Sequence, residues 1–257
     1  MEKIKKILTN EKGLFLALDQ GLEHGPKDFN LKNINPDYVL QIAEKGKYNA
    51  IILQKGLAEK YYQDYKTKIP LILKLNGRTR MQDELYSPQI CSVKNALKLG
   101  ASAIGYTLYF GSPYETKMIQ EFSKIQEEAK SCGLPVVLWA YPRGNKINEM
   151  NTETLAYAAR ASLELGADII KIKYNHKPEQ YKWVVKSAGK SKLFIAGGEK
   201  TTPLNVLKET YEVMKVGASG IAIGRNIWQH EEPLKLTKAI KSIIFDNKNI
   251  NEAVNFL

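Results

Sequence analysis

Eight short apolar segments recur along the chain, and most are separated by stretches with the periodicity of an amphipathic helix. The segments are 13–19, 49–54, 70–76, 101–109, 135–141, 168–174, 192–198 and 220–226. Each is nearly continuous in apolar residues, as is typical of strands that are covered on both faces. Strands that alternate with helices predict parallel βα units. Eight such units within 257 residues favour an α/β fold, a closed (β/α)8 TIM barrel forming a single domain over 1–257; the alternative is an open doubly wound sheet.

The junctions between helices and strands repeat a short pattern. Leu-Gly-Ala or Val-Gly-Ala stands at 99–101, 165–167 and 216–218, each time just before an apolar segment. Glycine after the last helical turn is a stop signal for a helix. The repetition indicates one supersecondary unit used several times, and no linker or low-complexity stretch divides the chain.

Charge and cysteine content limit the class of protein. The net charge of +11 invites nucleic acid as a partner, but the basic residues are spread out, which favours a solvated basic surface and suits a small anionic substrate. Cys91 and Cys132 stand in no metal or redox spacing, which indicates a reducing compartment. We find no signal peptide and no apolar run of the ~20 residues that a membrane span needs, so we expect a cytoplasmic protein without a membrane partner.

The segment 168–174 carries two lysines inside an apolar run. Strand side chains alternate between faces, so Lys171 and Lys173 share a face, and in a barrel both would point into the polar mouth. Desolvation and mutual repulsion lower the pKa of such lysines, and a neutral amine can attack a carbonyl to form a Schiff base. The alternative is that each lysine only pairs with Asp19, Glu199 or a surface carboxylate.

Other polar residues gather where the remaining strands end. Asp19 follows the first segment, Lys74 and Asn76 stand in the third, and Tyr141 ends the fifth. Glycines end the seventh and eighth segments, where barrels often bind phosphate through bare backbone N–H groups; these glycines could also serve only tight turns. A phosphorylated carbonyl compound that meets a lysine suggests aldol chemistry. Tyr141 is then the candidate proton carrier, unless it only packs on Trp139.

Several motifs together resemble one family of enzymes. "ALDQGLEHGP", "LAEKYY", "LILKLNG", "GASAIGYTLYFGS", "LWAYPRG", "LGADIIKIKY", "AGGEKT" and "GIAIGRNIWQ" are similar, in order and spacing, to archaeal-type class I fructose-bisphosphate aldolases, also called DhnA-type or FbaB-type aldolases. The similarity extends from about residue 10 to about residue 240. It implies a (β/α)8 barrel that forms a Schiff base with dihydroxyacetone phosphate or fructose 1,6-bisphosphate, without a cofactor or metal.

The resemblance also implies roles for individual residues. By position, the Schiff-base lysine is Lys171, with Lys173 as the neighbour that lowers its pKa and contacts substrate oxygens. Tyr141 is the acid/base residue, and Asp19 holds or deprotonates the hydroxyl at the bond that is cleaved. The substrate-binding and phosphate-binding positions fall on the following residues: His24, Trp139, Arg143, Gly197, Gly198, Gly224 and Arg225.

The chain departs from the family pattern at a few places. Ala196 stands where relatives often have serine, Gln20 replaces a histidine of some members, and "NHK" follows "KIKY" where others have a Thr-Gly turn. The stretch between "YPRG" and "DIIK" is also one residue shorter than in relatives. These changes leave Lys171, Tyr141 and Asp19 in place. We therefore expect them to affect the substrate preference and not the chemistry.

Other functions remain as alternatives. One is a related Schiff-base aldolase or transaldolase, such as 2-amino-3,7-dideoxy-D-threo-hept-6-ulosonate synthase, although that branch tends to lack Trp139. Another is a non-catalytic sugar-phosphate-binding protein. A zinc-dependent aldolase is disfavoured because His24, His176 and His230 have no ligand spacing. The resemblance implies a homo-oligomer, and the amphipathic segment 249–257 could dock on its own barrel or on a neighbour.

Overall fold

The structure, a computed structural model, describes residues 4–145 and 147–257 and contains a closed barrel of parallel strands in sequence order. The strands are β1 (Gly13–Leu18), β2 (Ala50–Gln54), β3 (Leu71–Lys74), β4 (Ala103–Phe110), β5 (Val136–Pro142), β6 (Ile169–Ile172), β7 (Lys192–Ala196) and β8 (Gly220–Ile223). The barrel closes where β8 pairs with β1. The prediction of a TIM barrel is therefore confirmed, and the open sheet is wrong.

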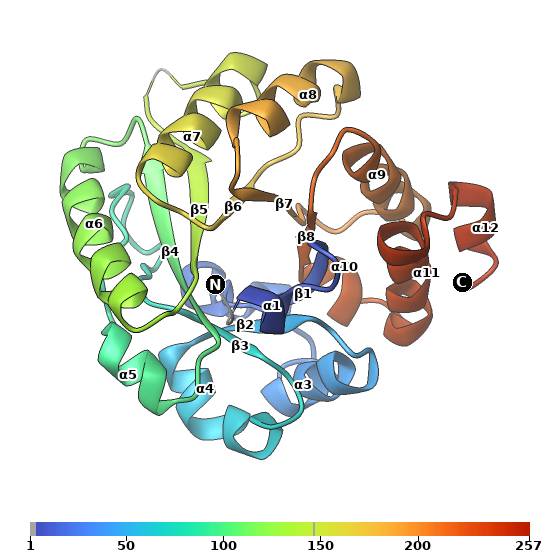
Figure 1. Ribbon diagram of the computed structural model, residues 1–257. Coiled ribbons are helices and arrows are strands. Elements are labelled where there is room, and N and C mark those ends of the chain that lie inside the picture. Colours follow the sequence, from blue (N-terminus) through green and yellow to red (C-terminus); the bar gives the residue numbers. More distant parts are fainter. Residues whose placement is uncertain (1–3, 146) are drawn as a thin grey trace.

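Helices surround the barrel and follow the strands in turn (Figure 1). The outer helices are α3 (Pro36–Lys45), α4 (Lys55–Tyr61), α5 (Val93–Lys98), α6 (Glu115–Ser131), α7 (Thr152–Glu164), α8 (Pro178–Ser187), α9 (Pro203–Lys215) and α11 (Pro233–Asp246). Shorter elements are α1 (Ile4–Ile7), α2 (Gly21–His24), α10 (Arg225–Trp228), α12 (Ile250–Val254) and the 3₁₀ turns η1 (Gly25–Asp28) and η2 (Tyr62–Tyr65). Segment 249–257 docks on its own chain, where α12 packs against α9 and α11.

The interior of the barrel is a packed apolar core. Phe15 of β1 and Phe194 of β7 stack with their ring centroids 4.4 Å apart. Ile7 of α1 is fully buried and belongs to the same interior cluster, so α1 closes the amino-terminal end of the barrel, in the middle of Figure 1. The polar chemistry is thereby restricted to the opposite end.

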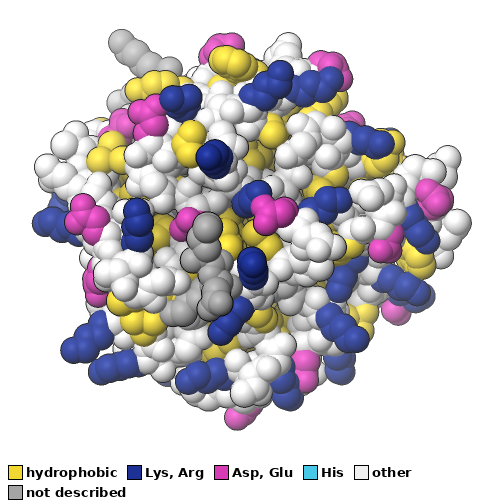
Figure 2. Space-filling view, in the orientation of Figure 1, with side chains coloured by type: hydrophobic (Ala, Val, Ile, Leu, Met, Phe, Trp, Pro, Cys, Tyr) yellow, Lys and Arg dark blue, Asp and Glu magenta, His cyan; other side chains and the backbone are white. Residues whose placement is uncertain are grey.

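Surface charge is dispersed on the face that Figure 2 shows. Lysine and arginine side chains are distributed over much of this face, with acidic side chains among them. This distribution matches the predicted solvated basic surface. Among the described residues, no helix is long and apolar enough to cross a membrane.

The repeated glycine junctions have a common conformation. Gly100, Gly166 and Gly217 have φ angles of +82°, +86° and +97°. In each case the following alanine donates its backbone N–H to a carbonyl in the last turn of the preceding helix, as in Ala218 to Val213. This left-handed turn reverses the chain from helix to strand, and glycine adopts it without steric cost.

We expect Gly217→Ala to destabilise the protein by about 1–2 kcal/mol because a side chain disfavours a left-handed backbone. A Cβ atom at this position would meet only Val185 Cγ1, at an ordinary 3.5 Å, so the cost comes from the backbone. Denaturant unfolding would measure the change. Gly56→Ala is the matched control, since nothing lies within 4 Å of that Cβ atom and no left-handed φ is required, and it should not lower stability.

Candidate active site

A cavity of about 620 Å³ opens at the carboxyl ends of the strands. Side chains and backbone from the ends of β1, β3, β5, β6, β7 and β8 line it. The residues predicted from the sequence all lie on its wall: Asp19, His24, Trp139, Tyr141, Arg143, Lys171, Lys173, Gly197, Gly198, Gly224 and Arg225. Parallel strands bring their carboxyl ends to one side of the barrel, which is why residues far apart in the sequence meet there.

Lys171 is the buried amine of this cavity. It lies in β6 beside Trp139 of β5, is only 5% exposed, and places Nζ 4.8 Å from the centre of the indole ring. Within the described residues, its Nζ forms no hydrogen bond or ion pair. The pKa of Lys171 is lowered to about 8, chiefly by burial; the Asp19 carboxylate opposes this shift, and the Lys74 charge adds to it. Near neutral pH a fraction of about one tenth is therefore the neutral amine.

Asp19 and Lys74 form an ion pair beside this amine. Lys74 Nζ lies 3.4 Å from Asp19 Oδ2, and both side chains are less than a tenth exposed. Burial raises the pKa of Asp19, but the charges of Lys171 and Lys74 outweigh burial and lower it overall. Asp19 is thus a carboxylate. Lys74 was not among the predicted site residues, although its place at the end of the third strand was the signal for it.

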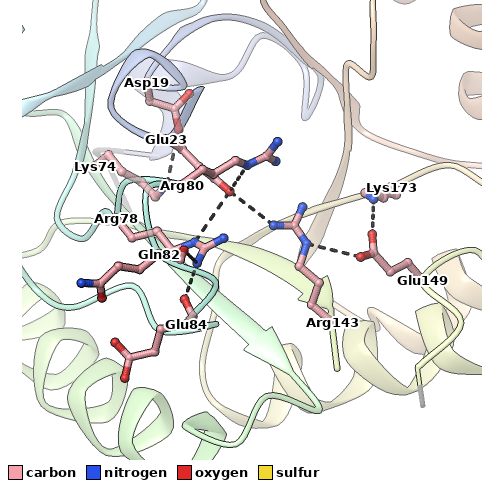
Figure 3. A network of polar contacts seen from close by, with 10 residues as sticks. All are labelled: Asp19, Glu23, Lys74, Arg78, Arg80, Gln82, Glu84, Arg143, Glu149 and Lys173. Atoms are coloured by element: carbon pink, nitrogen blue, oxygen red, sulfur yellow. Dashed lines mark hydrogen bonds and ion pairs between the residues drawn. The ribbon is translucent and has the colours of Figure 1, made fainter. Parts of the chain in front are cut away.

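The expectation that Lys173 lowers the pKa of Lys171 is wrong. The neighbouring ammonium that has this effect is Lys74. β6 ends at Ile172, and Lys173 lies on the cavity wall beyond it, ion-paired with Glu149 (Figure 3). Glu149 follows β5 and also lies 3.4 Å from Arg143 Nε. The alternative that the lysines merely pair with carboxylates therefore describes Lys173 and does not describe Lys171.

Tyr141 is an un-ionised phenol on the cavity wall. Burial raises its pKa well above the ordinary value, and the Asp19 carboxylate raises it further. Trp139, two residues before Tyr141, is 2% exposed. Two ammonium groups lie over its ring: Lys74 Nζ is 4.6 Å and Lys171 Nζ is 4.8 Å from the ring centre. Gly105 makes room for this ring, since a Cβ atom there would lie 2.4 Å from it.

The glycines at the ends of β7 and β8 serve different structural purposes. A Cβ atom at Gly197 would lie 2.9 Å from Ile223 Cα, and one at Gly224 would lie 2.7 Å from the Ala17 carbonyl oxygen. Close packing therefore requires glycine at both positions, a structural reason other than the tight-turn alternative. Gly198 has open space around its Cα, so its backbone faces the cavity unshielded.

Asp28 connects two of the predicted substrate-binding residues. His24 Nδ1 lies 2.7 Å from Asp28 Oδ2, and Arg225 lies 3.5 Å from Asp28 Oδ1. Arg225 also donates to the Gly198 carbonyl at 3.1 Å. Burial raises the pKa of Asp28, but its contacts with His24 and Arg225 lower it overall, so it orients both side chains as a carboxylate. Sequence reasoning missed Asp28.

A cluster of three arginines lies across the mouth (Figure 3). Glu23 is 3.3 Å from Arg80, 3.3 Å from Arg143 and 4.0 Å from Arg78. Arg78 and Arg143 also lie over the ring of Tyr109. Among the described residues, Glu23 and Glu149 are the carboxylates that contact the three guanidinium groups, so the cluster keeps an excess of positive charge. Arg78, Arg80 and Glu23 were missed, although "QGLEHGP" and "LNGRTR" follow the first and third strands.

Comparison with known proteins agrees with this geometry. The model of the DeoC/LacD aldolase family matches residues 14–230. The chain belongs to this family of aldolases. Relatives in this group include the class 1 fructose-bisphosphate aldolase of Thermoproteus tenax, 45% identical over 99% of this chain and 98% of its own, and that of Halobacterium salinarum, 40% identical over 96% of each. The family resemblance noted in the sequence is confirmed.

Solved aldolase structures share the barrel closely. An archaeal fructose 1,6-bisphosphate aldolase superimposes with a TM-score of 0.91 and 45% identity over 95% of this chain and 98% of its own. A second, 44% identical with a TM-score of 0.90 over 95% of this chain and 98% of its own, has its catalytic lysine covalently bound to the carbinolamine intermediate of the substrate. These descriptions concern those proteins.

The histidines of this aldolase family member have separate surroundings. His176, in the "NHK" departure from the family pattern, has a φ of +58° and lies 3.7 Å from Glu209, and His230 accepts from the backbone N–H of Glu232. Among residues 4–145 and 147–257, no group of three His, Cys, Asp or Glu side chains is placed to hold a metal ion.

We expect Lys171 to react as an amine with a midpoint near pH 8. Reactivity should rise as the pH passes this value, because only the deprotonated amine is a nucleophile, whereas an ordinary lysine titrates near 10.4. Competitive acetylation at a series of pH values, read peptide by peptide with mass spectrometry, would measure it. A midpoint near 10.4 for Lys171 would contradict the assignment.

Proposed function

We propose that this protein is a class I fructose-bisphosphate aldolase, which reversibly cleaves fructose 1,6-bisphosphate to dihydroxyacetone phosphate and glyceraldehyde 3-phosphate. The observation that carries the proposal is the buried Lys171 amine, free of an ion pair among the described residues, with a pKa of about 8, in the cavity of an aldolase-family barrel. The relatives that bear this enzyme's name match nearly the whole chain.

Lys171 supplies the covalent step. Its neutral amine attacks the keto carbon of the substrate, and the carbinolamine loses water to form an iminium ion. The iminium then accepts the electron pair of the carbon–carbon bond that breaks, and an enamine forms. The cavity wall favours this step because it buries Lys171 and forms no hydrogen bond or ion pair with its Nζ among the described residues.

Tyr141 and Asp19 divide the proton transfers. Asp19 is ionised, so it accepts the proton of the hydroxyl group on the carbon that becomes the aldehyde. Tyr141 keeps its proton, so it can donate one to the enamine carbon after cleavage and recover it in the reverse direction. The ionised Asp19 therefore suits the role of base, and the protonated Tyr141 suits the role of acid.

Two positively charged places match a substrate with two phosphate groups. Arg225 and the bare backbone of Gly198 lie at the ends of β7 and β8 and would hold one phosphate. Arg78, Arg80 and Arg143 would hold the other, in competition with Glu23. Lys173, paired with Glu149 next to Arg143, contributes charge to the same part of the wall.

The thiol and the distribution of charge bear on the setting of the enzyme. We place it in the cytoplasm, acting as a single domain and without nucleic acid, because Cys91 is a buried thiol and the basic residues are spread along the sequence and over the face that Figure 2 shows. We also propose a homo-oligomer. The neighbouring helices α7 and α8 each expose a large aromatic side chain: Tyr157 is 71% exposed and Trp183 is 55% exposed. We expect the contact between subunits to involve these two residues.

Reductive trapping tests the covalent step. Borohydride added with dihydroxyacetone phosphate should leave a substrate adduct on Lys171, because an imine is reduced to a stable secondary amine. Peptide mapping by mass spectrometry locates it. Lys171→Met should abolish the adduct, and Lys173→Met, the matched control, should retain it. An adduct on Lys173, or no adduct on folded protein, would sink the assignment.

Steady-state kinetics with substrates that carry one or two phosphate groups test the role of the arginine cluster. Arg80→Ala should raise KM for fructose 1,6-bisphosphate roughly tenfold and leave KM for fructose 1-phosphate unchanged, because only the first substrate has a phosphate for this side chain. Arg160→Ala is the control, since Arg160 pairs with Glu164 on the surface of α7. Equal effects of Arg80→Ala on both substrates would place the second phosphate elsewhere.

A further inference from the structure

The carboxylate of Glu23 lies where three guanidinium groups converge at the mouth of the cavity (Figure 3). Its contacts all end on one oxygen, Oε1, which is 3.3 Å from Arg80 Nε, 3.3 Å from Arg143 Nη1 and 4.0 Å from Arg78 Nε. Hydrogen bonds between a guanidinium group and a carboxylate are ordinarily about 2.7–2.9 Å long. One oxygen is therefore shared among three donors, at distances that leave each contact weak.

The arginines keep donor capacity that Glu23 does not satisfy. Arg78 Nε is a buried atom without a hydrogen-bond partner among the described residues, since 4.0 Å is too long for a hydrogen bond. A buried donor without a partner is costly, so this atom points to a ligand of the cavity that Arg78 lines. A phosphate monoester has three terminal oxygens and two negative charges, and it matches three guanidinium groups better than one carboxylate oxygen does.

Glu23 is a negative charge at this place. Burial raises the pKa of Glu23, but the charges of Arg143 and Arg80 outweigh burial and lower it overall, so the side chain is a carboxylate. An anion that binds the same arginines must compete with this charge, because like charges at short distance repel each other. Glu23 therefore opposes the binding of a phosphate to the cluster.

The carboxylate can leave the arginines without disturbing the core. Glu23 belongs to α2, which has no buried residue, and its side chain is 26% exposed. Rotation of the side chain toward water is enough to free the guanidinium groups. The contact between Glu23 and the cluster is thus one that a stronger anion can replace.

We propose that Glu23 is a positioning residue that substitutes for the second phosphate group: it holds the three arginines when the substrate carries one phosphate and competes with the second phosphate when there is one. The proposal rests on the proposed function for the identity of the substrate, whereas its electrostatic part concerns any phosphate at the cluster. It follows that Glu23 narrows the preference of the protein for a sugar with two phosphates over a sugar with one.

Protection of the arginines from phenylglyoxal by inorganic phosphate tests the competition and requires no substrate. Peptide mapping by mass spectrometry gives the phosphate concentration that halves the modification of Arg78, Arg80 and Arg143. In Glu23→Gln this concentration should fall about three- to tenfold, because the amide keeps an oxygen acceptor and removes only the charge. Glu164→Gln is the matched control without effect, since Glu164 pairs with Arg160 on the surface of α7.

The direction of the change separates competition from a merely structural role. If Glu23 only orients the arginines, removal of its charge weakens phosphate binding, and a half-protecting concentration that rises or stays unchanged in Glu23→Gln would overturn the proposal. Glu23→Asp covers the case in which Glu23→Gln does not fold. Its shorter carboxylate lies farther from the arginines, so its half-protecting concentration should also lie below that of the wild type, and a higher value would contradict the proposal.

Steady-state kinetics add the catalytic readout. Glu23→Gln should lower KM for fructose 1,6-bisphosphate about three- to tenfold and leave KM for fructose 1-phosphate unchanged, because the second substrate brings no phosphate to the cluster. Equal changes for both substrates would contradict the proposal. If the wild type cleaves neither substrate, the proposed function fails, while the protection by inorganic phosphate still decides the role of Glu23.

Discussion

The cost of burying an ammonium group is the constraint on which this site depends. A closed ring of hydrogen-bonded strands surrounds Lys171, and the apolar core beneath it keeps water out. Such surroundings disfavour a positive charge and lower the pKa of Lys171 to about 8. The amine becomes a nucleophile near neutral pH because of where the barrel holds it. The rest of the cavity either preserves this condition or binds what the amine attacks.

Carboxylates organise the positive charge of the cavity. Asp19 engages Lys74, Glu23 lies among three arginines, Asp28 joins His24 to Arg225, and Glu149 pairs with Lys173. Each acid orients the cations around it, and the arginines at Glu23 retain an excess of positive charge for an anion. Lys171 differs from these other cations because, among the described residues, its Nζ has no carboxylate within ion-pair distance. This pattern joins a phosphate-binding mouth to a reactive amine without placing a carboxylate on that amine.

Much of the site could be predicted because parallel barrels bring strand ends together. Lys171, Tyr141 and Asp19 stand at the ends of recognisable apolar segments, so their shared cavity followed from the βα pattern. The interaction partners could not be predicted in this way. The partner of Lys173 lies in the loop after β5, and that of Arg80 lies in α2, at sequence distances that no periodic pattern covers. The effect assigned to Lys173 was wrong for this reason, and Lys74, although noted in the third strand, was given no role.

The sequence by itself determined the barrel, the glycine turns that end its helices and the central residues of its mouth, among them Lys171, Tyr141 and Asp19. Those properties depend on local periodicity, on left-handed backbone conformations and on motifs, all of which are readable along the chain. Only the tertiary structure decided which charges meet: Asp19 with Lys74, Glu149 with Lys173 and Glu23 with the arginines. Electrostatic interactions act through space at distances of a few ångströms, so the pKa of Lys171 is a property of the folded barrel.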